Sequence, residues 1–264
     1  MLRDVNPASS KTRAQTSGRP EPDRRLVEAV RAGLAAAGDP ERAERMQAYM
    51  KSAMPFRGVP APALKQVCRE VLPEHPVGDR ASWAATVRTL WDDAAFREER
   101  YAALALTGHR AYRRWQDTGT LALYEHLAVT GAWWDYVDEI AANRVGPILA
   151  GDPAAVAPVL LDWAAGEDIW LRRVAILAQL KAKGTTDTAL LRACLSPSLG
   201  QSEFFLRKAI GWALREYART DPTWVLAYVA EQEDRLAPLS RREALKHLPS
   251  QDVNSSGGGA ERRS

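Results

Sequence analysis

Asp138 is the residue whose type and position most strongly suggest chemistry in this sequence. The similar stretches Trp-Leu-Arg-Arg and Phe-Leu-Arg-Lys end at Arg173 and Lys208, which are 35 residues apart, and Asp138 lies a further 35 residues before Arg173. Looser steps of 38 and 34 residues add Arg100 and Arg242 to this column of equivalent positions. Because stacked repeats bring equivalent positions onto one surface, the column predicts a basic, polyanion-binding face with a single reactive acid.

Two tryptophans add aromatic surface to this pattern. Trp134 precedes Asp138 by four residues, so a helix would place both on one face. Trp212 lies on a second predicted helix and shares one stripe with three cations, Lys208, Arg215 and Arg219. Basic side chains interleaved with an aromatic ring suit phosphates and sugars. The alternative is that both tryptophans belong to the core and the charged side chains are merely solvated.

Further cations lie near these positions. Arg173 is expected either to pair with Asp138 and keep it ionised, because a cation lowers a carboxylate pKa, or to bind a phosphate in a bidentate manner. An ordinary ion pair between neighbouring repeats is the alternative. Arg172 and Lys181 add to the basic surface. Lys51 and Lys65, around a predicted helix connector, could reach a backbone phosphate, although a plain helix–helix connector is the favoured interpretation for most residues of this segment.

Composition bounds the function classes. The 264 residues allow one large domain or two small ones, and the apolar fraction of 46% is enough for a substantial core. The formal net charge is only +3, but the segment from Asp168 to Arg219 contains nine lysines and arginines against four acids. This local concentration of charge favours a polyanion partner.

Several kinds of site are not expected. Cys68 and Cys194 are far apart and the four histidines are scattered, so two buried thiols are predicted, with no metal and no cofactor. A glycine-rich phosphate loop, a nucleophile with nearby His and Asp, and an acidic magnesium cluster are all missing from the sequence. No run of about 18 apolar residues exists and Met1–Pro22 has no apolar signal core, so a cytoplasmic protein is expected.

The pattern of apolar residues predicts the fold. Between two polar tails, residues 1–22 and 249–264, which are expected to be disordered, apolar residues recur at helical spacings. Pairs of aspartate and proline beginning at Asp39, Asp152 and Asp221 fit helix N-caps. The period of about 35 residues predicts an all-α fold over residues 23–248: a single right-handed α-solenoid of HEAT-like antiparallel helix pairs with a concave basic groove. The predicted helices include 40–54, 133–150, 168–182 and 202–219.

These residues together resemble the AlkD-like DNA alkylation repair glycosylases over about residues 25–248. The most specific strings are Trp-Trp-Asp-Tyr-Val-Asp, ending at Asp138, and Ile-Gly-Trp-Ala-Leu-Arg-Glu-Tyr, which contains Trp212. The resemblance places the family's catalytic aspartate on Asp138. It places the family's two tryptophans, its arginine and its N-terminal DNA-binding tyrosine on Trp134, Trp212, Arg173 and Tyr49. In place of the family's arginine-rich run after Gly58, this chain has Val59–Lys65, so contacts from that edge depend on Lys65.

The resemblance also implies an activity: a monofunctional DNA glycosylase that excises positively charged N3- and N7-alkylated purines, leaves an abasic site and does not flip the base. The expected partner is double-stranded DNA containing such purines. A monomer working on the nucleoid, without membrane contact, is expected. Two alternatives share the fold: a non-catalytic DNA-binding HEAT-repeat protein, and a protein–protein scaffold, which would need no such acid and tryptophans.

Overall fold

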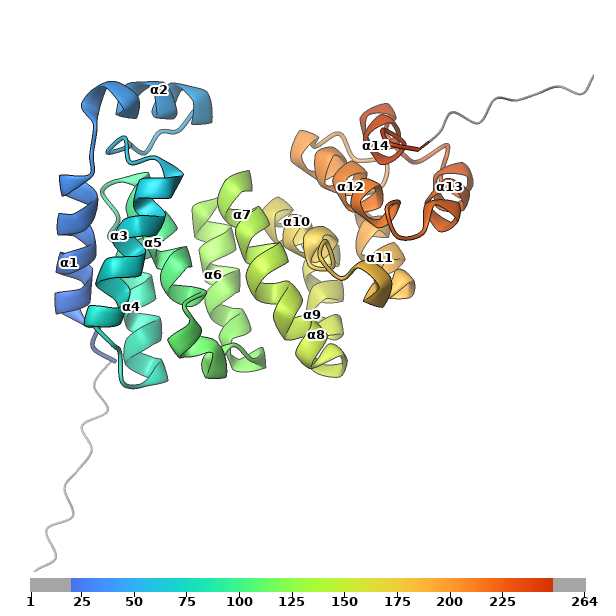
Figure 1. The fold of residues 1–264 in the computed structure, drawn as a ribbon. Coiled ribbons are helices and arrows are strands. Elements are labelled where there is room, and N and C mark those ends of the chain that lie inside the picture. Colours follow the sequence, from blue (N-terminus) through green and yellow to red (C-terminus); the bar gives the residue numbers. More distant parts are fainter. Residues whose placement is uncertain (1–19, 249–264) are drawn as a thin grey trace, which may run out of the picture. The chain divides into compact units, whose positions relative to one another are not determined.

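The computed structural model describes residues 20–248 (Figure 1). Apart from residues 20–22, the two predicted tails lie outside this range. Residues 20–248 fold into helices joined by turns and contain no strand, which confirms the all-α class. The tertiary contacts gather into two compact units that divide between Ala103 and Leu104.

The first unit is built from four helices and most of a fifth, α1 (Arg24–Ala36), α2 (Pro40–Met50), α3 (Ala61–Glu74), α4 (Arg80–Asp92) and α5 (Arg97–Thr107). Helix α1 packs against α3 and α4. Leu26, Val30 and Leu34 recur at helical spacing on α1 and are fully buried, as are Trp83 and Trp91 of α4. The amphipathic pattern that predicted helices therefore also supplies the core of this unit.

Helix α2 is tied to the connector that follows it. The buried Glu98 carboxylate accepts hydrogen bonds from the backbone N–H groups of Arg57, Gly58 and Val59 at 2.9 to 3.0 Å. The N–H of Asp39, which caps α2, donates to the Arg57 carbonyl. The helix predicted over 40–54 ends earlier, at Met50, because the next residue adopts a left-handed conformation. The connector is thus an ordered part of the first unit.

The second unit contains the remaining elements. They are η1 (Arg110–Trp115), η2 (Thr118–Thr120), α6 (Leu121–Gly131), α7 (Trp134–Ile140), η3 (Ala141–Val145), α8 (Gly146–Gly151), α9 (Pro153–Ala165), α10 (Ile169–Leu177), η4 (Lys183–Thr185), α11 (Thr188–Leu195), η5 (Ser196–Ser198), α12 (Phe204–Tyr217), α13 (Pro222–Glu231) and α14 (Pro238–Ala244). Helix α10 packs against α7, α9 and α12, and α12 packs against α14. This is the stacking expected of an α-solenoid built from helix pairs.

Two sequence signals for helix boundaries are confirmed. The side chains of Asp39, Asp152 and Asp221 each accept a backbone hydrogen bond at the start of α2, α9 and α13, with proline as the first helical residue. The helix predicted over 133–150 forms as α7, the π-helical turn η3 and α8 in uninterrupted succession.

Among residues 20–248, none of the helices has the length and apolar character needed to cross a bilayer.

Candidate active site

All four residues predicted to be catalytic line one depression of about 390 Å³ in the second unit. They come from three helices, because Trp134 and Asp138 lie on α7, Arg173 on α10 and Trp212 on α12. Phe204, Phe205, Lys208, Arg215 and Glu243 complete the lining. The repeat pattern therefore brought together residues up to 78 positions apart, from 134 to 212.

The core-facing residues of α7 explain why its polar face reaches the depression. Tyr136, Val137 and Ile140 are fully buried. Trp134 and Asp138 lie four residues apart on the other face of this helix and are only half-buried. Burial of one apolar stripe thus fixes the direction of the carboxylate.

Arg173 holds Asp138 through both nitrogens of a guanidinium fork. Its Nε donates to Oδ1 at 2.7 Å and its Nη2 to Oδ2 at 2.9 Å, while Nη1 donates to the Phe205 carbonyl at 2.6 Å. Arg173 is only 4% exposed, so its orientation is determined by these partners. The expected pairing of Arg173 with Asp138 is confirmed, and its bidentate form fixes the plane of the carboxylate.

The pKa of Asp138 moves in the direction opposite to the one its cation alone would cause. Burial raises the pKa of this carboxyl above its ordinary value of 3.8, and the hydrogen bonds and charge of Arg173 act against that rise without cancelling it. The expected lowering of this pKa by Arg173 is present but is outweighed by burial, because the side chain of Asp138 is only 14% exposed. Removal from water destabilises the ionised carboxylate more than the hydrogen bonds and charge of Arg173 stabilise it.

An aromatic cluster lies next to the depression, and Phe204 and Phe205 are the two of its rings that line it. The rings of Trp133, Trp170 and Phe205 lie 5.0 to 6.4 Å apart, centroid to centroid. Phe204 packs edge-on against Phe205 and is 56% exposed. Phe204 and Phe205 were not among the predicted site residues. Their position four residues before Lys208 and Ala209 on the helix of Trp212 was the available signal.

Glu243 also lines the depression although it was not among the predicted site residues. A strict step of 35 residues from Lys208 falls on Glu243, whereas the looser step of 34 had selected Arg242. The structure supports the strict register, since Glu243 lines the depression and pairs with Lys208 at 3.1 Å. Arg242 is exposed and does not line the depression. The column therefore ends in an acid, and Asp138 is not its only carboxylate.

Other predicted cations of the second unit lie outside this depression. Arg172 donates from Nε to the Gly166 carbonyl at 2.5 Å. Lys181 pairs with Asn143 and lines a separate depression of about 860 Å³. Arg219 lies in the turn after α12, is exposed, and is 3.4 Å from Glu216 of that helix. These residues remain predicted DNA contacts, but nothing places them beside Asp138.

The residues predicted in the first unit form no part of the lining described above. Tyr49, at the end of α2, is 81% exposed. Lys51 follows it in the left-handed conformation, with φ of 48°, and Lys65 is exposed on α3. Arg100, the first member of the predicted column, lies over the Trp91 ring and donates to its carbonyl. Arg100 is thus engaged within the first unit.

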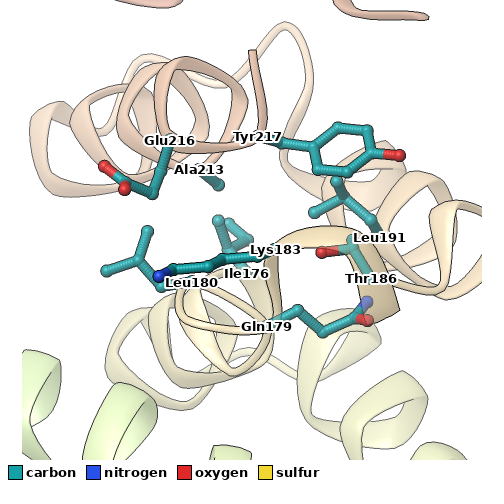
Figure 2. Close-up of a pocket in the computed structure, with 9 residues that line it drawn as sticks. All are labelled: Ile176, Gln179, Leu180, Lys183, Thr186, Leu191, Ala213, Glu216 and Tyr217. Atoms are coloured by element: carbon teal, nitrogen blue, oxygen red, sulfur yellow. The ribbon is translucent and has the colours of Figure 1, made fainter. Parts of the chain in front are cut away.

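Two further kinds of site can be assessed. Figure 2 shows a cavity between α10, α11 and α12, but its volume of about 20 Å³ has room for little more than one water molecule. Cys68 and Cys194 are buried, as predicted, and burial raises the pKa of their thiols to about 11 and about 12. Neither thiol is therefore an activated nucleophile. Within residues 20–248 no group of three His, Cys, Asp or Glu side chains could hold a metal ion.

Comparison with known proteins identifies the family. The model of the family described as DNA alkylation repair enzyme matches residues 30–248. A solved structure described as a predicted DNA alkylation repair enzyme from Enterococcus faecalis is 30% identical, with a TM-score of 0.73, and covers 81% of this chain and 97% of its own. No curated protein sequence matches the chain. The chain belongs to the DNA alkylation repair enzyme family, and its role lies in the repair of alkylated DNA.

Proposed function

We propose that the protein is a monofunctional DNA glycosylase that releases positively charged N3- and N7-alkylated purines from duplex DNA and leaves an abasic site. The observation that carries this proposal is the Asp138 carboxylate. It lies in an aromatic-lined depression, is 14% exposed, and is held by both nitrogens of Arg173. A fixed negative charge in a partly dehydrated site is suited to stabilising a cation that forms during bond cleavage.

In the proposed reaction the protein needs to stabilise positive charge and does not need to protonate the leaving base. An alkylated purine already carries its positive charge, so the base leaves without receiving a proton. As the bond between C1′ and the base nitrogen lengthens, the positive charge passes to the deoxyribose, where Asp138 stabilises it. The oxygen of a water molecule then bonds to C1′, and its proton passes to Asp138 or to solvent. Because Arg173 has already oriented the carboxylate, no reorganisation is needed at that moment.

The aromatic walls have a separate task. Trp134 and Trp212 flank the depression, and Phe204 extends its exposed ring from the start of α12. Flat apolar rings pack against sugar C–H groups and displace water, which strengthens the attraction between the carboxylate and the developing cation. We propose that the sugar and backbone occupy this depression while the base stays in the duplex stack. The reaction would then tolerate bulky adducts on the base.

Release of free base from a duplex containing N7-methylguanine tests the proposal. Wild-type protein should release 7-methylguanine, and Asp138→Asn should bind the duplex but react at least about 100-fold more slowly, since one fixed electrostatic group is lost. Asp162→Asn is the matched control, because this acid is exposed on α9 and does not line the depression. Equal release by wild type and Asp138→Asn would leave only a DNA-binding protein. Failure to release a bulky N7 adduct would contradict the stacked-base part alone.

A further inference from the structure

Glu243 lies in the same depression as Asp138 and is paired with two cations. One oxygen, Oε1, lies 3.1 Å from Lys208 Nζ, and the other, Oε2, accepts from Arg215 Nη1. The side chains of Glu243, Lys208 and Arg215 are 17%, 38% and 21% exposed, so the cluster is partly shielded from solvent. The two residues with which a phosphate would pair are thus already occupied by a carboxylate.

The close packing of α14 on α12 fixes this position. A Cβ atom added at Gly211 would lie 2.6 Å from Cβ of Glu243, so only glycine allows the two helices to approach this closely. Ser240, one turn earlier on α14, is buried and donates from Oγ to the Arg207 carbonyl at 2.8 Å. The close contact at Gly211 and the hydrogen bond of Ser240 hold α14 on α12. Glu243 therefore keeps its carboxylate against Lys208 and Arg215.

A carboxylate in this place opposes the binding of a polyanion. It neutralises cations that would otherwise release counterions on meeting phosphate, and it repels the phosphate directly. The hydrogen bond from Lys208 lowers the pKa of Glu243, so the carboxylate is ionised at neutral pH. If Glu243 served instead to position the two cations for DNA, its removal would weaken binding. The two roles therefore predict opposite signs.

We propose that Glu243 limits the affinity of this site for DNA: it neutralises Lys208 and Arg215 in the free protein and releases them to phosphate when a duplex binds. The inference rests on the proposed function, because it takes duplex DNA as the ligand. A site restrained in this way dissociates faster from undamaged DNA and from an abasic product. Glu243 acts through the two cations and is therefore a positioning residue rather than a catalytic one.

The test compares DNA binding by wild type and Glu243→Gln, using fluorescence anisotropy with an undamaged duplex at several salt concentrations. Glu243→Gln should bind about 3- to 10-fold more tightly at low salt, as expected for the loss of two partly exposed ion pairs. The slope of log K against log salt should steepen by about 0.9 for each phosphate gained. Glu233→Gln is the control, because it removes the same charge from a side chain that is 61% exposed and pairs with Arg241. This variant should leave binding unchanged.

Two further measurements separate the possible outcomes. In a Lys208→Ala/Arg215→Ala background, Glu243→Gln should no longer increase the affinity for DNA. Circular dichroism at the assay temperature checks that each variant is folded. Equal or weaker binding by Glu243→Gln, or the same gain from Glu233→Gln, overturns the inference. The glycosylase proposal is judged independently by release of 7-methylguanine by the wild type, which can succeed or fail whatever Glu243 does.

Discussion

Two opposing influences set the pKa of Asp138. Burial raises its pKa, and the forked contact with Arg173 holds the rise in check. A carboxylate in open water would stay ionised to lower pH but would be screened by solvent. At Asp138 the electrostatic effect is strengthened by dehydration, while Arg173 lowers the pKa and so favours the charged form. In the proposed mechanism the arginine therefore acts through the carboxylate.

Removal of Arg173 should therefore shift the pH dependence of base release. Because the proposed reaction needs ionised Asp138, we expect the rate to fall as the pH drops through the pKa of Asp138, which lies above the ordinary 3.8. Arg173→Gln removes the two contributions that lower this pKa, so the acid limb should move to higher pH. Arg173→Lys keeps a positive charge and should move it less. Single-turnover rates between about pH 5 and 8, corrected for spontaneous base loss, measure the shift.

A structural role for Arg173 alone would give a different result. If the arginine only supported the fold, Arg173→Gln would lower the fraction of active protein at every pH equally. The shape of the profile would then match that of the wild type, and no difference between the glutamine and lysine variants would appear in the position of the limb. An unchanged limb position contradicts the electrostatic role.

At the scale of elements, the sequence predicted most of what local rules determine. Helices were predicted because apolar residues recur at three and four positions, and their starts because aspartate caps and proline have strong local preferences. The repeat register selected Asp138 and Arg173, and helical spacing added Trp134 and Trp212, all four of which line the depression. It failed at α14, since the step from Lys208 to Glu243 depends on the lengths of the turns around α13, which local patterns do not fix. Side-chain directions such as those of Arg100 and Lys181 depend on tertiary packing and were equally out of reach.

Gly211 tests the packing of α12 on α14. Replacing a glycine within a helix by alanine ordinarily stabilises a protein by about 1 kcal/mol. Gly211→Ala should instead destabilise it by about 1–3 kcal/mol, because the new Cβ would lie 2.6 Å from Glu243 and 3.0 Å from the Ser240 carbonyl. Gly151→Ala, at a helical glycine with open space around its Cβ position, should be neutral or stabilising. Urea unfolding measures both, and equal effects would show that α14 is not held closely.

At the scale of the whole molecule, charge is distributed unevenly rather than in excess. The net charge of +3 is small, yet Asp168–Arg219 has five more cations than acids. The structure divides these cations into those that line the depression, Arg173, Lys208 and Arg215, and those that lie elsewhere, including Arg172, Lys181 and Arg219. The family match over residues 30–248 includes sequence from both units. Residues of either unit are therefore candidates for DNA contacts.

The salt dependence of DNA binding distinguishes among these candidate contacts. Each cation that neutralises a phosphate contributes about 0.9 to the slope of log K against log salt. Arg215→Ala should therefore weaken binding and flatten the slope by about that amount. Arg219→Ala is the matched comparison, since it removes an exposed arginine in the turn just after α12 that does not line the depression. A slope unchanged by Arg215→Ala would remove Arg215 from the interface. Equal flattening by both variants would extend the interface beyond the depression to the turn after α12.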